Sequence, residues 1–163
     1  MVGSEARITR QRILATLSNG MGCKTWRNLS VKHMPTYNII DVIPRPAERP
    51  RFSKMGHAYN SGEYRQYLDV LIWSIRALRI PDKPWHGIEA VFWFPYPKST
   101  PKSKLIPFAR HQKRPDGDNC IKALFDALEK CGVIKNDSAF SDISVKKKYS
   151  LSGGYIQFTL LTD

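Results

Sequence analysis

The sequence predicts an α+β fold in which a small mixed β-sheet is covered by two main helices. Three observations lead to this prediction. Runs rich in β-branched and aromatic residues recur at 37–43, 88–94, 142–150 and 155–161, with lengths typical of strands. Two longer segments, one at 61–79 and one after Asp118, repeat apolar residues with helical spacing. The resulting order is strand, helix, strand, helix and two strands, which favours a single layered domain.

The composition indicates one domain with an anionic partner. The chain has 163 residues, of which 42% are hydrophobic, so it can bury one core. Its 26 Lys and Arg against 14 Asp and Glu give a formal net charge of +12, which favours nucleic acid as the partner. No apolar run approaches the ~18 residues of a spanning helix, and no basic amphipathic helix with a broad aromatic face is present, so no membrane partner is expected.

The cysteines and the start of the chain point to the cytoplasm. Cys23, Cys120 and Cys131 make an odd number without CxxC spacing, which excludes a recognisable zinc site and suggests a reducing compartment. The first residues lack the apolar core of a signal peptide. We therefore expect a cytoplasmic protein.

Residues 1–36 are expected to form a basic N-terminal extension ahead of the main domain at 37–163. Within the extension, 4–17 can form a short helix with an imperfect apolar stripe. Two interpretations stay open: an arm that contacts the DNA backbone, or a poorly ordered leader that contributes only charge.

The first strand is expected at 37–43 and ends at Pro44. The prolines at 46 and 50 remove backbone donors, so the segment that follows is interpreted as an irregular basic loop. It carries Arg45, Arg49, Arg51 and Lys54. Phosphate contact by some of these residues and an ordinary solvated loop both remain possible.

The longest helix is expected at 61–79, with Ser61 as its N-cap and a wide apolar stripe from Tyr64 to Leu78. Pro81 and Pro84 lie beyond its end. The next strand, 88–94, holds a nearly continuous aromatic run, which suits burial on both faces or a contact between two copies.

A basic loop at 97–114 follows and contains no acid. Because it runs directly into an acidic turn, we favour the interpretation that it guides a polyanion there over that of a flexible solvated loop. The residues predicted to contact DNA are Lys104, Arg110, Lys113 and Arg114.

The acidic turn is Asp116-Gly117-Asp118. Glycine in the middle is expected to allow a backbone conformation closed to other residues, so that both carboxylates can turn the same way. A helix follows, with Ile121, Leu124, Phe125 and Leu128 on one stripe and Gly132 as its stop signal.

Three carboxylates around this helix suggest a metal site. Hard cations such as Mg²⁺ take oxygen ligands, and Asp116 and Asp118 supply two if Asp137 returns to them from the next element. Lys122, one helical turn after Asp118, would then support developing negative charge. Simpler interpretations also exist: a helix cap for Asp116 or Asp118, a surface pair of Lys122 with Asp126, and a turn residue for Asp137.

The last two strands are expected to form a hairpin around Ser152-Gly153-Gly154. In the first of them Ile143, Val145 and Tyr149 alternate toward one face. Lys146 and Lys148 share the polar face, where they either contact DNA or protect a sheet edge from aggregation.

The segment 114–138 resembles the RusA family of Holliday junction resolvases, small dimeric Mg²⁺-dependent endonucleases often encoded by phages and prophages. The resemblance rests on Arg114-Pro115-Asp116-Gly117-Asp118-Asn119, Lys122, Asp126-Ala127-Leu128, Gly132-Val133-Ile134 and Asn136-Asp137-Ser138. It implies a RusA-like, homodimeric α+β fold for 37–163 and hydrolysis of branched DNA in recombination and repair.

The resemblance also implies roles for individual residues. Asp116, Asp118 and Asp137 would bind Mg²⁺, for which Mn²⁺ would substitute, and Lys122 would be the catalytic or DNA-contacting lysine. Asn136 departs from the family pattern, where a second aspartate often stands, and this lowers the local negative charge. The alternative functions are a non-catalytic DNA-binding module, for instance a phage regulator, and a different nuclease class, for which no His-Asn-His arrangement or PD…(D/E)xK spacing is found.

Overall fold

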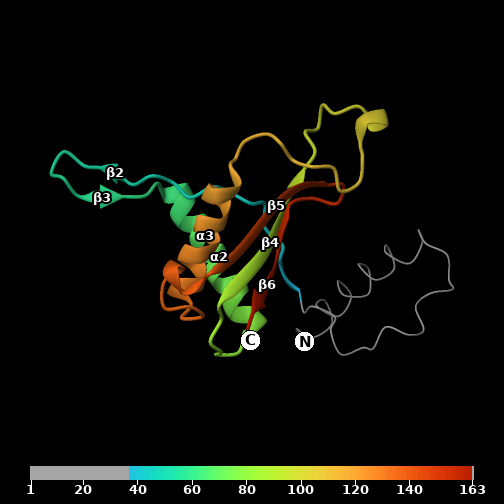
Figure 1. Ribbon diagram of the computed structural model, residues 1–163. Coiled ribbons are helices and arrows are strands. Elements are labelled where there is room, and N and C mark those ends of the chain that lie inside the picture. The colour runs from blue at the N-terminus through green and yellow to red at the C-terminus, as the bar shows by residue number, and fades with distance from the viewer. Residues whose placement is uncertain (1–36, 163) are drawn as a thin grey trace, which may run out of the picture. The chain divides into compact units, whose positions relative to one another are not determined.

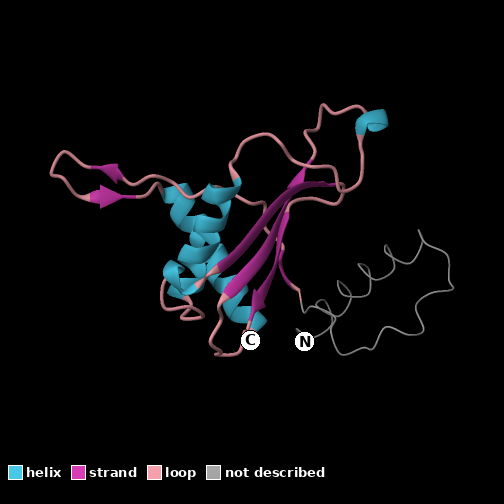
Figure 2. Cartoon of the chain, viewed as in Figure 1, coloured by secondary structure: helices cyan, strands magenta, loops and turns pink. Residues whose placement is uncertain are grey.

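The computed structural model describes residues 37–162 of the protein. One mixed sheet forms its centre, and two helices cover one face of that sheet (Figures 1 and 2). The predicted α+β class is confirmed. The extension at 1–36, with the helix expected at 4–17 and Cys23, lies outside the described residues.

The sheet contains four strands in the order β1 (Asn38–Ile40), β6 (Tyr155–Leu161), β4 (Gly87–Pro95) and β5 (Asp142–Ser150). β6 is antiparallel to both of its neighbours, whereas β4 and β5 are parallel, with Phe92 opposite Lys147. Parallel neighbours need a long crossover connection, and here that connection carries a helix. The connection between β4 and β5 therefore places its helix against the sheet.

The expected hairpin of the last two strands is wrong. β4 lies between β5 and β6, so the turn at 151–154 takes the chain past the end of β4 to its other side. The physical reason is the distribution of apolar side chains. Ile156, Phe158 and Leu160 of β6 are buried, which suits a central strand, whereas β5 carries the lysines at 146–148 and occupies an edge.

Helix α2 (Gly62–Leu78) forms as predicted. The Ser61 side chain accepts a hydrogen bond from the Tyr64 backbone N–H at 3.1 Å, which confirms the predicted N-cap. Arg79 ends the helix in a left-handed conformation at φ 49°. The buried members of its stripe are Tyr64, Tyr67, Leu68, Leu71 and Ile75.

Helix α3 (Gly117–Lys130) lies beside α2 on the same face of the sheet (Figure 1). A short 3-10 turn, η3 (Lys102–Lys104), interrupts the basic loop before it, and a second, η4 (Asp137–Ala139), precedes β5. The predicted stripe of α3 is buried: Ile121, Leu124, Phe125 and Leu128 all lie in the core.

A two-stranded ribbon replaces part of the expected irregular loop. β2 (Arg51–Phe52) and β3 (Ala58–Tyr59) pair antiparallel, with Arg51 opposite Tyr59. The prolines at 46 and 50 lie before the ribbon, so they remove no donor from its ladder. Figure 1 shows the ribbon projecting from the body of the domain.

The core between helices and sheet gives a first prediction. Leu124 is 0% exposed, and its replacement by alanine is expected to lower the free energy of unfolding by about 2–5 kcal/mol, because it removes apolar contact and leaves a cavity. Urea unfolding followed by circular dichroism measures the loss. Leu151→Ala, at a side chain that is 59% exposed, is the matched control and should change stability little. Equal losses in both variants would contradict the assigned core.

Candidate functional site

The acidic turn lies at the start of α3. Asp116 is the N-cap residue, Asp118 lies in the first turn, and both are exposed. An N-cap aspartate usually accepts a hydrogen bond from a backbone N–H of the first turn, but the Asp116 side chain makes no such bond. Asp116 therefore occupies the predicted cap position, but its carboxylate makes no capping hydrogen bond to the helix.

Lys147 of β5 holds the loop that leads into this turn. Its ammonium donates hydrogen bonds to the carbonyl oxygens of Lys113, at 2.9 Å, and Pro115, at 2.7 Å. The Lys147 carbonyl in turn accepts from the backbone N–H of His111 at 3.0 Å. One strand residue thus fixes the chain at positions 111, 113 and 115, immediately before Asp116.

Three charged side chains of this region affect the pKa of the buried Cys120 thiol. Burial raises the pKa of its thiol to about 11; the Lys147 ammonium acts to lower that pKa, and the Asp118 and Asp116 carboxylates act to raise it. Both carboxylates and the ammonium therefore act on the thiol of this first-turn residue of α3.

At Gly117 the space for a side chain is tight, while the backbone angle is an ordinary one. The predicted backbone conformation closed to other residues is absent here: Gly117 is the first residue of α3, and its φ is not positive. A Cβ there would approach Val145 Cγ1 to 3.2 Å. The absence of a side chain allows α3 to begin directly against β5.

The three carboxylates do not form one metal-binding cluster within residues 37–162. In the part of the chain that the structure describes, no three His, Cys, Asp or Glu residues are close enough to hold one metal ion together. Asp137 is exposed and opens η4. Two contacts fix the residues that follow: Phe140 packs on Phe125 of α3, with ring centroids 5.3 Å apart, and Ser141 N–H bonds to the carbonyl of His86, next to the start of β4. The predicted role of Asp137 remains a prediction.

Lys122 is exposed on α3, one turn after Asp118. Its expected pairing with Asp126 is wrong, since the ion pairs found among residues 37–162 are Arg45–Glu63 and His86–Asp142. The Asp126 carboxylate accepts a hydrogen bond from the Tyr64 hydroxyl at 3.4 Å instead. Burial, followed by the charge of Asp126, raises the pKa of that hydroxyl.

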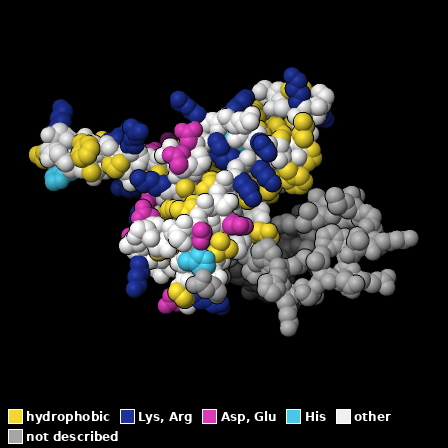
Figure 3. Space-filling view, in the orientation of Figure 1, with side chains coloured by type: hydrophobic (Ala, Val, Ile, Leu, Met, Phe, Trp, Pro, Cys, Tyr) yellow, Lys and Arg dark blue, Asp and Glu magenta, His cyan; other side chains and the backbone are white. Residues whose placement is uncertain are grey.

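The predicted DNA-contacting residues fall into two groups. Arg110, Lys113 and Arg114 are exposed on the segment that leads to the acidic turn, and Arg110 forms an isolated bridge with β5 at Lys148. Lys104 is exposed in η3, which lies earlier in the same loop. Figure 3 shows Lys and Arg side chains over the hairpin ribbon and the middle of the face viewed there.

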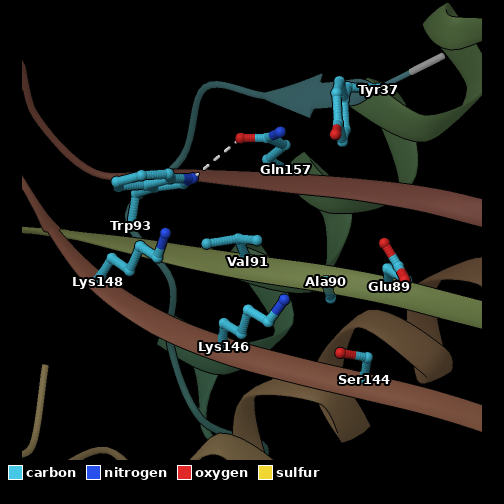
Figure 4. A pocket seen from close by; sticks show the side chains of 9 residues that line it. All are labelled: Tyr37, Glu89, Ala90, Val91, Trp93, Ser144, Lys146, Lys148 and Gln157. Carbon is cyan, nitrogen blue, oxygen red and sulfur yellow. Dashed lines mark hydrogen bonds between the residues drawn. The ribbon is translucent and has the colours of Figure 1, made fainter. Parts of the chain in front are cut away.

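Lys146 and Lys148 belong to a different surface. Side chains alternate along a strand, and Val145 and Lys147 lie against Gly117, so the two neighbouring lysines point to the other face of the sheet. Figure 4 shows both of them beside Trp93 and Gln157 in a pocket on that helix-free face. The Lys148 ammonium lies 5.4 Å from the centroid of the Trp93 ring. These two lysines and the acidic turn are therefore not brought together.

His111 is a buried histidine next to the turn. It is 8% exposed and stacks on Phe94, with ring centroids 4.2 Å apart. Burial, and then the positive charge of Lys147 and Lys113, lowers the pKa of its imidazole, which is therefore neutral at pH 7.

This shift predicts acid sensitivity. A histidine whose pKa is lower in the folded than in the unfolded protein binds more protons on unfolding, so it lowers stability as the pH falls below about 6.5. We expect the wild-type melting temperature to fall more between pH 7 and 5 than that of His111→Phe, measured by differential scanning fluorimetry. His57→Phe, at an exposed histidine, is the control. Parallel pH curves for wild type and His111→Phe would contradict the prediction.

The exposed carboxylates of the turn offer the oxygen ligands that hard divalent cations prefer, and the net charge of +12 favours an anionic partner such as nucleic acid. The chain belongs to the RusA family: the sequence model of that family, described as Endodeoxyribonuclease RusA, matches residues 41–158. The match begins just after β1 and ends within β6, so it contains the acidic turn, α3 and β5. The comparison with curated proteins gave no match.

Family membership supports nuclease activity and confirms the resemblance seen in the sequence. None of the helices within 37–162 has the length and apolar character needed to cross a membrane. Lys147 of this site could not be singled out from the sequence, because it is the middle one of three consecutive lysines. The signal was its position two residues after the apolar Val145, on the same side of the strand.

Proposed function

We propose that the protein is a divalent-metal-dependent endonuclease that resolves four-way DNA junctions by paired phosphodiester hydrolysis. Membership of an endodeoxyribonuclease family supports the reaction class. The observation that carries the site is the exposed Asp116 carboxylate, which occupies an N-cap position without capping and stands two residues from the exposed Asp118.

The residues present fit a hard divalent cation. Mg²⁺ usually takes one or two protein carboxylates together with water and substrate phosphate, and Asp116 and Asp118 offer two such groups on the surface. Asp137 is the third carboxylate that the family resemblance implies, and it would have to approach from η4. Bound Mg²⁺ or Mn²⁺ would polarise a phosphoryl oxygen and lower the pKa of a bound water.

The chain's own residues then have separate tasks. Lys122 supplies positive charge where negative charge develops during attack on phosphorus. Lys147 keeps the preceding loop in place through its two carbonyl contacts. Arg110, Lys113 and Arg114, exposed on the segment before the turn, bind DNA phosphates.

We further propose that the protein acts as a homodimer. Resolution of a four-way junction requires two opposed cuts, and a dimer with twofold symmetry presents two equivalent sites. Sedimentation of the full chain with and without junction DNA tests this; a monomer bound singly to each junction would contradict it.

The proposed activity is tested with a labelled synthetic junction. Full-length protein and Mg²⁺ or Mn²⁺ should produce symmetric nicks near the branch point, and EDTA should abolish them. A linear duplex with the sequence of one pair of arms is the control and should be cut far more slowly. Cleavage that persists in EDTA would exclude the metal mechanism, and binding without cleavage at any metal concentration would favour the non-catalytic DNA-binding module.

A further inference from the structure

Residues 49–60, which we call the hairpin arm, expose apolar side chains to an unusual degree. Met55 is 86% and Phe52 73% exposed, the highest values for large hydrophobic side chains among residues 37–162. Tyr59, on the opposite strand, is 51% exposed. Exposed apolar side chains grouped at the end of a projecting element commonly mark a binding site.

The same arm is strongly basic. It carries Arg49, Arg51 and Lys54, all of them exposed, and contains no Asp or Glu. Figure 3 shows the arm covered by hydrophobic and basic side chains. The cations can contact phosphates, and the apolar side chains between them can pack against bases. Nucleic acid is the partner that offers both kinds of group.

The base of the arm is fixed. The Glu48 carboxylate accepts hydrogen bonds from the Ser61 hydroxyl, at 2.8 Å, and the Ser61 backbone N–H, at 3.2 Å, so the two ends of the arm are joined. At the tip, Ser53 N–H bonds to the His57 carbonyl at 2.9 Å. These contacts fix the arm both at its base and near its tip.

The arm starts next to the acidic turn. The backbone N–H of Ala47, two residues before the arm, donates to the carbonyl of Asn119 in the first turn of α3 at 2.8 Å. Asn119 directly follows Asp118. A nucleic acid whose phosphate lies at the turn is therefore within reach of the arm.

We propose that the hairpin arm is a DNA-binding element: Arg49, Arg51 and Lys54 contact phosphates, and Phe52 and Met55 insert against unstacked bases at the branch point. This inference rests on the proposed function for its substrate. A two-stranded ribbon fits a DNA groove, and apolar wedges bind where bases are separated. A second copy of the chain is a poorer partner, because it also carries a net charge of +12.

Binding measurements in EDTA separate the arm from catalysis. The variant Phe52→Ser/Met55→Ser should bind a fluorescent four-way junction about tenfold more weakly or worse, whereas its affinity for linear duplex should change by less than about twofold, since only the branch offers unstacked bases. Trp73→Ser, at a side chain 70% exposed on α2, is the matched control and should bind both DNAs as wild type does.

The variant Arg51→Gln/Lys54→Gln tests the cations. It should weaken binding to both DNAs and reduce the slope of log Kd against log salt by about 2, the value for two lost phosphate contacts. Lys83→Gln, at an exposed lysine between α2 and β4, is the control and should leave the slope unchanged. Circular dichroism melting checks that each variant is folded.

Two results would overturn the proposal. The first is junction affinity of the tip variant equal to that of Trp73→Ser. The second is a smaller sedimenting species for the tip variant in the absence of DNA, which would show that the tip contacts another copy of the chain.

If the arm variants behave as expected but no variant of the protein cuts DNA, the proposed function fails and the proposal for the arm is retained. If the protein cuts junctions and the tip variant binds them as wild type does, the arm proposal fails and the proposed function stands.

Discussion

Replacing Asp116 or Asp118 by asparagine is expected to lower metal-dependent junction cleavage by about a hundredfold or more, because loss of a charged ligand removes several kcal/mol of metal-assisted stabilisation. Junction binding in EDTA should stay near the wild-type value, since both residues are exposed and their removal makes the protein more positive. Single-turnover cleavage and fluorescence anisotropy measure the two quantities.

The control for this pair is Asp82→Asn, at an exposed aspartate between α2 and β4, which should cut as wild type does. Asp137→Asn is informative because residues 37–162 contain no cluster of three acidic side chains that could hold one metal ion. We expect a smaller loss for it than for Asp116→Asn. An equal loss would show that Asp137 completes the site in the assembled protein, and wild-type rates for both Asp116→Asn and Asp118→Asn would contradict the proposed site.

Lys147→Met is expected to reduce cleavage by about tenfold to a hundredfold, the usual range for residues that orient metal ligands without binding the metal. The change removes the donor to the carbonyls of Lys113 and Pro115 and so releases the loop before Asp116. Because the ligand geometry loosens, the concentration of Mn²⁺ that gives half-maximal cleavage should rise as well. Metal titrations of the cleavage rate measure both effects.

Lys146→Met is the matched control, because it removes the same charge from the next residue on the opposite face of the sheet (Figure 4). It should leave the metal requirement unchanged and at most weaken DNA binding. If Lys146→Met and Lys147→Met show the same metal dependence, Lys147 contributes only charge and has no positioning role. Lys147→Arg should restore part of the activity, since it retains a cationic donor.

The local pattern of the sequence was sufficient for most elements of the fold. Ser61 and the stripe after it predicted α2, and the apolar spacing from Ile121 to Leu128 predicted α3, because capping and helical periodicity are properties of neighbouring residues. Strand pairing is not local. β5 does not pair with β6 in a hairpin but pairs parallel with β4. This arrangement depends on how much apolar surface β6 buries in the centre of the sheet.

For the candidate site, too, some features follow from the sequence and others only from the tertiary structure. The sequence alone located Asp116 and Asp118 at a helix start, the cations that precede them, and the family to which the chain belongs. Tertiary structure decided that Lys147 faces the acidic turn while Lys146 and Lys148 face away, and that Gly117 lies close to Val145. It also decided that no three acidic side chains of residues 37–162 gather as one metal site. Residues that are adjacent in a strand point to opposite faces, and residues far apart in the chain meet only where the sheet order brings them together.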